Sequence, residues 1–204
     1  MFGANEIINL ADKVGAIDAI KYRLLNQPDK AAAKLADSLD ELYKTFKALD
    51  EEIVRYLSLY FDSEATIIQG RAVLLGMEVG QSRIRMHEAR GHCAKIKNIY
   101  QKHLNGWFDR VFKNETDNKD LKNFFEDIGT ADDAIIQAVD KVTDWLTKEA
   151  EQTLDLVDGG NRLGANQRVT QARIDAKPAR IRMTEAMAHL RGMQAEFIAS
   201  SKTV

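Results

Sequence analysis

The chain has 204 residues, a net charge of −2 and a hydrophobic fraction of 45%, which lies in the range of ordinary globular proteins. It has only two prolines, Pro28 and Pro178, and is rich in helix-forming residues, so the composition predicts an all-α fold. The single Cys93 excludes an internal disulfide, and no uncharged apolar run approaches the roughly 20 residues that a membrane-spanning helix needs. The N-terminus carries acids where a signal peptide has basic and apolar residues, so we expect a cytoplasmic location and no membrane span.

Charge is divided unevenly along the chain. Residues 114–158 hold thirteen acids and four lysines, whereas residues 161–191 hold seven basic residues against two acids. Residues 83–102 hold six basic residues against one glutamate. Because the acidic and basic segments nearly balance, we expect them to face one another within the fold, with binding of an anionic partner as the alternative. We do not expect nucleic-acid binding.

Two helices are predicted in the first sixty residues. The first runs from about Asn5 to Leu25 and ends before Pro28, because the residue before a proline resists helical geometry. The second is capped by Asp29 and ends near Phe61. Its apolar residues recur at spacings of three and four, which predicts one buried seam: Ala32, Leu35, Leu39, Leu42, Phe46, Leu49, Ile53, Tyr56 and Tyr60.

Ser63 is expected to cap a third helix in which the same rhythm continues. No strong helix breaker occurs before residues 113–118, so we predict a very long helix with its seam in the core. The seam would consist of Ile68, Ala72, Leu75, Val79, Ser82, Met86, Ala89, Cys93, Ile96 and Tyr100.

The second half predicts a short apolar helix over residues 121–128 and two longer ones. Thr130 and Asp133 form a start resembling a capping box, and the helix that follows should end at the glycines of residues 158–161. The last helix is expected from about residue 166 to residue 200, with a kink at Pro178. Its seam would be Ala179, Met183, Ala186, Leu190, Met193 and Phe197.

An internal repeat underlies this layout. The segment "RIRMHEARGH" at 83–92 matches "RIRMTEAMAH" at 180–189 in seven of ten positions, at an offset of 97 residues. Further identities recur at the same offset, which favours a tandem duplication over coincidence. We therefore predict two three-helix units, 1–97 and 98–194, followed by a tail of residues 195–204. The further identities pair Asp12, Val14, Leu24, Lys44, Leu49, Glu52, Leu57, Leu59 and Arg71 with Asp109, Val111, Leu121, Lys141, Leu146, Glu149, Leu154, Leu156 and Arg168.

This layout resembles the PhoU family, regulators of phosphate transport that are built from two tandem three-helix bundles. In that family, acidic E/D-x-x-x-D motifs on the helices gather metal ions. Here "EARGH" at 88–92 and "EAMAH" at 185–189 keep the glutamate and carry histidine in place of the aspartate, and Asp140 with Asp144 forms a D-x-x-x-D. The resemblance implies a regulatory helical bundle with metal ligands at these positions.

The histidines suggest a metal site, and the angles between residues on a helix decide which side chains could share one ion. His87 and His92 are five residues apart, which places them about 140° apart on a helix and prevents them from sharing an ion; we interpret His87 as a packed histidine. Glu88 with His92, and Glu185 with His189, are i,i+4 pairs that each offer two ligands of the kind helical bundles use for divalent metals. We favour an ordinary Glu–His helix pair, with the metal site as the alternative, because two ligands need more from a partner helix.

Arginines are the other repeated feature. Arg83 and Arg180 are expected beside the apolar seams, where a half-buried guanidinium needs a carboxylate or a bound anion. One interpretation is ion pairs across the bundle, and the other is an anionic ligand held by Arg83, Arg85, Arg180 and Arg182. Cys93 lies in a seam and is interpreted as a buried apolar residue.

No set of nucleophile and base can be assembled from these patterns, so we do not expect an enzyme. The function predicted first is a regulatory or scaffold bundle that acts through protein–protein contacts, with self-association or a protein partner. The alternative is a bundle that binds a metal or an anion through the duplicated Glu/His and Arg positions.

Overall fold

The computed structural model describes residues 4–26, 30–112, 116–127 and 133–201, and this part of the chain contains helices and no strand. Within it, the side chains of residues 81–86, 89, 116–118, 120 and 127 are also left undescribed. The all-α prediction is therefore confirmed. The helices are α1 (Ala4–Leu25), α2 (Lys30–Leu57), α3 (Glu64–Glu78), α4 (Gln81–Ile99), the π-helix η1 (Tyr100–Leu104), α5 (Asn105–Phe112), α6 (Thr116–Asp127), α7 (Ala134–Asp158) and α8 (Arg162–Ser201).

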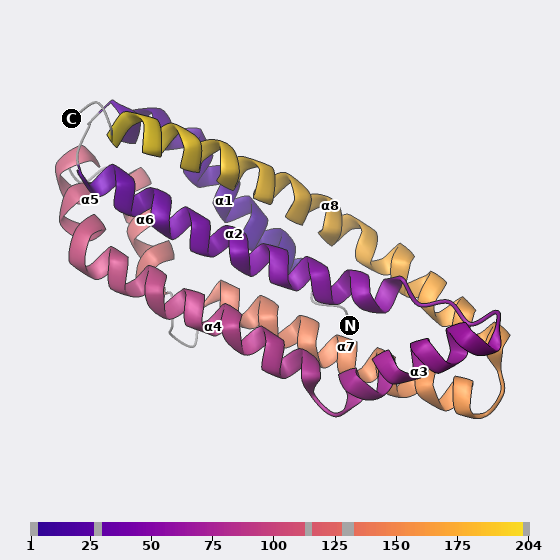
Figure 1. The fold of residues 1–204 in the computed structure, drawn as a ribbon. Helices are drawn as coiled ribbons and strands as arrows, with labels where there is room; N and C mark the ends of the chain where they lie inside the picture. The colour runs from indigo at the N-terminus through magenta and orange to yellow at the C-terminus, as the bar shows by residue number, and fades with distance from the viewer. Residues whose placement is uncertain (1–3, 27–29, 113–115, 128–132, 202–204) are drawn as a thin grey trace.

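The helices form an elongated bundle (Figure 1). Helices α1, α2, α4, α7 and α8 run along its length, with α5 and α6 at one end and α3 at the other. Helix α2 contacts both α8 and α4, while α7 contacts α3, α4 and α8. The long helices therefore pack against helices from far along the sequence.

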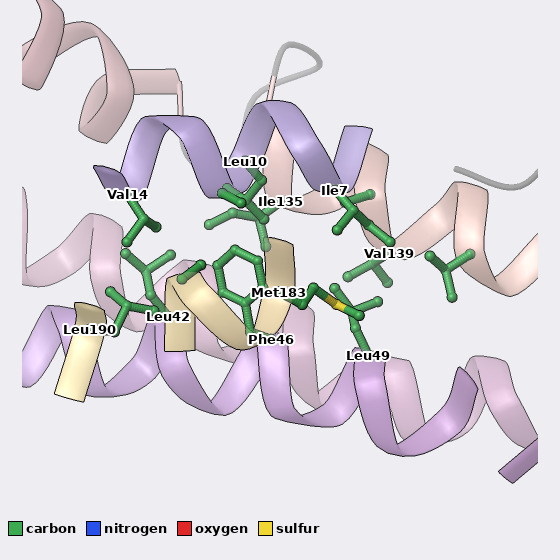
Figure 2. Packing of buried hydrophobic residues seen from close by; sticks show 14 of the residues in the cluster. Ile7, Leu10, Val14, Leu42, Phe46, Leu49, Ile135, Val139, Met183 and Leu190 are labelled. Atoms are coloured by element: carbon green, nitrogen blue, oxygen red, sulfur yellow. The ribbon is translucent and has the colours of Figure 1, made fainter. Parts of the chain in front are cut away.

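Buried residues of four helices interdigitate in the middle of the bundle (Figure 2). The α2 seam is central, since Leu42, Phe46 and Leu49 are all fully buried. They meet α1 on one side and α7 and α8 on others, where Met183 is also fully buried. The alternation of three and four residues therefore identified a face of α2 that is buried from Ala32 to Tyr56. Tyr60, the last predicted member, lies beyond the end of α2 and is 55% exposed.

Helix ends follow the local signals in three places. Ser63 caps α3, because its hydroxyl accepts from the backbone N–H of Thr66 while the Thr66 hydroxyl accepts from the Ser63 N–H. Asp133 is itself the N-cap of α7 and accepts from two backbone N–H groups, whereas the predicted box placed it three residues after the cap; Thr130 lies outside the described residues. Gly159 ends the helix. Helix α8 continues through Pro178, whose side chain is exposed.

The prediction of one very long third helix is wrong. Gly80 has a φ of +86°, a left-handed conformation that glycine adopts readily, and it separates α3 from α4. The π-helix η1 then follows α4 directly. The break changes which residues of α3 face the core: Leu74 and Met77 are buried, whereas Ile68 and Val79 are 63% and 73% exposed.

The acidic and basic segments face one another only in part. Arg168 of α8 lies 2.9 Å from Glu149 of α7, measured from Nε to Oε2, and Arg90 of α4 pairs with Asp140 of α7. Other arginines of α8 instead reach the carboxylates of α2, as Arg191 does. Part of the basic segment is therefore not matched by the acidic one.

Candidate functional site

Glu88 and His92, the first predicted Glu/His pair, have different surroundings. His92 of α4 is half-buried and its Nδ1 pairs with the Glu41 carboxylate of α2. Lys44 Nζ lies 3.0 Å from the other Glu41 oxygen. Burial alone would raise the pKa of Glu41, but the hydrogen bonds from Lys44 and His92 outweigh it, so that its pKa is lowered. Glu88, the predicted partner of His92, is exposed.

The second pair has the same arrangement. His189 Nδ1 lies 2.9 Å from an oxygen of Asp18 on α1, and Glu185 lies 3.1 Å from Arg182 on its own helix. In both halves of the chain the histidine thus meets a carboxylate of another helix. Within the described residues no group of three or more His, Cys, Asp or Glu side chains is arranged to hold a metal ion. The divalent metal site remains a prediction.

The predicted arginine cluster is described only in its second half. The side chains of Arg83 and Arg85 lie outside the described residues. Arg180 Nε donates to Asp50 of α2 at 2.7 Å, which is an ion pair across the bundle. Arg182 pairs with Glu185 on the surface of α8.

A groove beside Arg180 is the most distinct surface feature of this region. It has a volume of about 630 Å³ and lies between the last turn of α2 and the middle of α8. We call it the α2–α8 groove. It is lined by Val54, Leu57, Ser58, Arg173, Lys177, Arg180, Ile181, Thr184 and Glu185.

The lining combines cations with apolar side chains. Arg173 donates from Nε to the Leu57 carbonyl at 2.6 Å and from Nη2 to the Leu59 carbonyl at 3.1 Å, so its guanidinium closes the C-terminal end of α2. Val54 and Ile181 are 37% and 49% exposed. The groove therefore offers apolar surface and positive charge to a partner. Of its three cations, the sequence patterns had predicted only Arg180 to bind an anion.

Helix α3 presents a second unusual surface. Its inner face packs on α7, and beside this contact the exposed Arg71 donates from Nε to Asp158 at 2.7 Å. Its outer face carries an exposed apolar stripe at spacings of four, three and four residues, which we call the α3 stripe: Ile68, Ala72, Leu75 and Val79. At about 100° per residue these four positions fall on one side of the helix.

The sequence held a signal for this surface that the prediction of a single seam missed. Between residues 64 and 78, apolar residues occur on both sides of the helix, as Leu74 and Met77 do on the buried side. A helix that is apolar all round requires cover on both faces.

Cys93 is a packing residue, as the sequence predicted. It is 2% exposed, and burial raises the pKa of its thiol to about 12, with Asp133 nearby acting in the same direction. A thiol of this kind is protonated at neutral pH and is a poor nucleophile.

Comparisons with family models, with curated proteins and with solved structures found no match. The PhoU-like character of the chain therefore remains a prediction that rests on the residues quoted above. The described helices include none with the length and apolar character needed to cross a bilayer.

Proposed function

We propose that the protein is a non-enzymatic regulatory or scaffold protein that acts in the cytoplasm through protein–protein contacts made at the α3 end of the bundle. The α3 stripe is the observation that carries this proposal. Isolated exposed apolar residues are normal, but large apolar side chains gathered on one region mark interaction surfaces.

The exposed apolar residues are concentrated near this end. Among the described residues, ten large apolar side chains are exposed, and most of them lie on the last turn of α2, on α3 and its flanks, or on the first half of α8 (Figure 1). The members of this group are Val54, Tyr60, Ile68, Leu75, Val79, Leu163, Ile174 and Ile181. Tyr22 and Ile198 are the two outside it.

We also propose that the bundle arose from the tandem duplication, with units 1–97 and 98–194. Two observations support it. Tyr56 and Thr153, which are 97 residues apart, share a 2.8 Å hydrogen bond between their hydroxyls, as equivalent residues do beside a twofold axis. In addition, α2 contacts α8 just as α7 contacts α3 and α4, which is the reciprocal pairing that such an axis requires.

Photo-crosslinking from defined positions tests the proposed function. A benzophenone amino acid replaces Ile68 in one variant and Tyr22 in a matched control, since these side chains are 63% and 55% exposed. We expect discrete protein adducts from position 68, in purified protein or in extract of the source cells, and none from position 22. Replacing Leu75 and Val79 by serine should abolish the adducts from position 68. Equal labelling at both positions would overturn the proposal.

The alternative function, binding of an anion, is favoured by one observation. Lys177 lines the α2–α8 groove without an ion-pair partner among the described residues, one turn from Arg173. Thermal stabilisation by phosphate that disappears in Lys177→Ala would support this alternative. The metal form of the alternative is tested by the metal content of purified protein compared with that of His92→Ala/His189→Ala.

A further inference from the structure

The α2–α8 groove carries positive charge that no carboxylate of the described residues neutralises. Arg180 is paired with Asp50, and the one acid in the lining, Glu185, is paired with Arg182. Arg173 bonds only to main-chain carbonyls within the described part of the chain, and Lys177 has no partner there. Two cations one helical turn apart therefore face an apolar groove.

The opposite charge pattern occurs on α7. Glu151 and Asp155 are both exposed, lie one helical turn apart, and have no ion-pair partner in the part of the chain that the structure describes. We call this pair the acidic ridge. At the 97-residue offset, Glu151 and Asp155 correspond to Val54 and Ser58, which line the α2–α8 groove. Corresponding places in the two halves thus carry different surfaces.

We propose that the α2–α8 groove of one copy of this chain binds the acidic ridge of a second copy. The inference rests on the proposed function, because it names the partner in the protein–protein contact. Residues four apart on a helix are separated by about 6 Å along its axis. Two helices lying side by side therefore bring both carboxylates of the ridge opposite both cations of the groove.

Apolar surface gives this contact its stability, because ion pairs at a surface contribute little alone. On the groove side, Val54 and Ile181 are exposed, and Ile174 extends the apolar surface along α8. On the ridge side, Arg71 of α3 donates to Asp158, one turn from Asp155 of the ridge, and the exposed Leu75 lies one turn from Arg71. Association through these surfaces covers apolar side chains on both copies, and the charges fix their register.

The contact joins a groove on one copy to a ridge on another. It closes as a twofold dimer where each copy's groove holds the other copy's ridge, and is head to tail otherwise. A groove cannot pair with a second groove, because positive charges would meet, and the ridge cannot pair with a second ridge for the converse reason. In either arrangement the average mass rises with protein concentration, and only the head-to-tail arrangement leaves one surface of each copy available.

Light-scattering masses over a concentration series test the proposal with three variants. Lys177→Glu alters the groove and leaves Arg173, which closes α2, in place. Glu151→Lys/Asp155→Lys alters the ridge. Lys102→Glu, an exposed cation of η1 at the other end of the bundle, is the matched control. Circular dichroism verifies that each variant keeps its helices.

For the wild type, we expect a mass that rises with concentration and falls at high salt, because salt screens the ion pairs. The groove and ridge variants should each associate about tenfold or more weakly than the wild type, as charge reversal across an interface does. The Lys102→Glu control should behave as the wild type.

Mixing the two altered proteins is the decisive step. The groove variant retains a native ridge and the ridge variant retains a native groove, so an equimolar mixture should recover a one-to-one complex that neither forms alone. A wild type that stays monomeric at low salt, or a mixture that recovers nothing, overturns the proposal. If crosslinks from position 68 then reach a different protein, the proposed function stands without this partner; if no adduct forms, both fall.

Discussion

Helices α2 and α3 carry the same apolar rhythm and have opposite environments. In α2 the seam from Leu35 to Tyr56 is fully buried, because α8 and α4 pack along it. In α3 the stripe at Ile68 and Val79 faces outward, while the buried contact with α7 is made by other residues such as Leu74. Apolar periodicity therefore identifies a helix face that is favourable to bury. Whether that face is buried within this chain depends on which helices pack against it.

The largest expected difference between the two helices is in stability. Phe46→Ala in the α2 seam should lower the free energy of unfolding by about 3–5 kcal/mol, because a fully buried ring leaves a cavity. Val79→Ala, at the C-cap of α3, should change it by no more than about 0.5 kcal/mol, since this side chain is 73% exposed. Urea unfolding of the two variants measures both values. Similar losses in the two would contradict the contrast between the helices.

The next effect concerns the attachment of α3. Gly70 lies against Phe61, and a Cβ added there would come within 2.5 Å of the ring. Gly70→Ala should therefore destabilise the protein by about 1–3 kcal/mol, as overpacking of a closed contact does. Gly91→Ala is the control in α4, where a Cβ has open space. It should stabilise the helix by about 0.5–1 kcal/mol, and thermal melting would show shifts of opposite sign.

A smaller effect is expected at the turn that separates α3 from α4. Gly80→Ala should cost about 1 kcal/mol, because an L side chain is strained at a φ of +86° even though no neighbour crowds the position. Gly192→Ala, in the interior of α8, has the same open surroundings without the positive φ. Equal gains in stability for both alanines, measured by urea unfolding, would show that the turn does not hold the helices apart.

The smallest effect is a pH dependence in α2. The pKa of Glu41 is lowered in the folded protein, so its contribution to stability is present above the ordinary pKa of a glutamate, about 4.3, and is lost as the pH falls through the lowered value. Glu41→Gln should therefore be less stable than the wild type at neutral pH by at most about 1 kcal/mol. The difference should shrink in acid. Glu51→Gln, at an exposed carboxylate of the same helix, serves as the control and should show no such trend.

Much of the fold could be predicted from the sequence, and the exceptions have physical causes. The α2 seam and the Ser63 cap are local patterns that packing confirms. The break at Gly80 was missed because an isolated glycine is tolerated inside many helices and only its backbone angle reveals the turn.

The candidate site was less predictable. Sequence spacing placed Glu88 beside His92, but partners on other helices decide such contacts, and His92 meets Glu41 instead. The α2–α8 groove joins Val54 to Lys177, residues more than a hundred positions apart, and no local pattern relates them.

The packing of α8 has a consequence for how the protein is made. Helices α1 and α2 are synthesised before α8, yet both pack against it. Ribosomal synthesis is slow compared with helix formation, so the part of α2 that α8 covers stays in contact with water until α8 has emerged. During that interval the nascent chain presents an apolar surface that favours chaperone binding, and a message that stalls before α8 leaves α1 and α2 without the helix that packs against both.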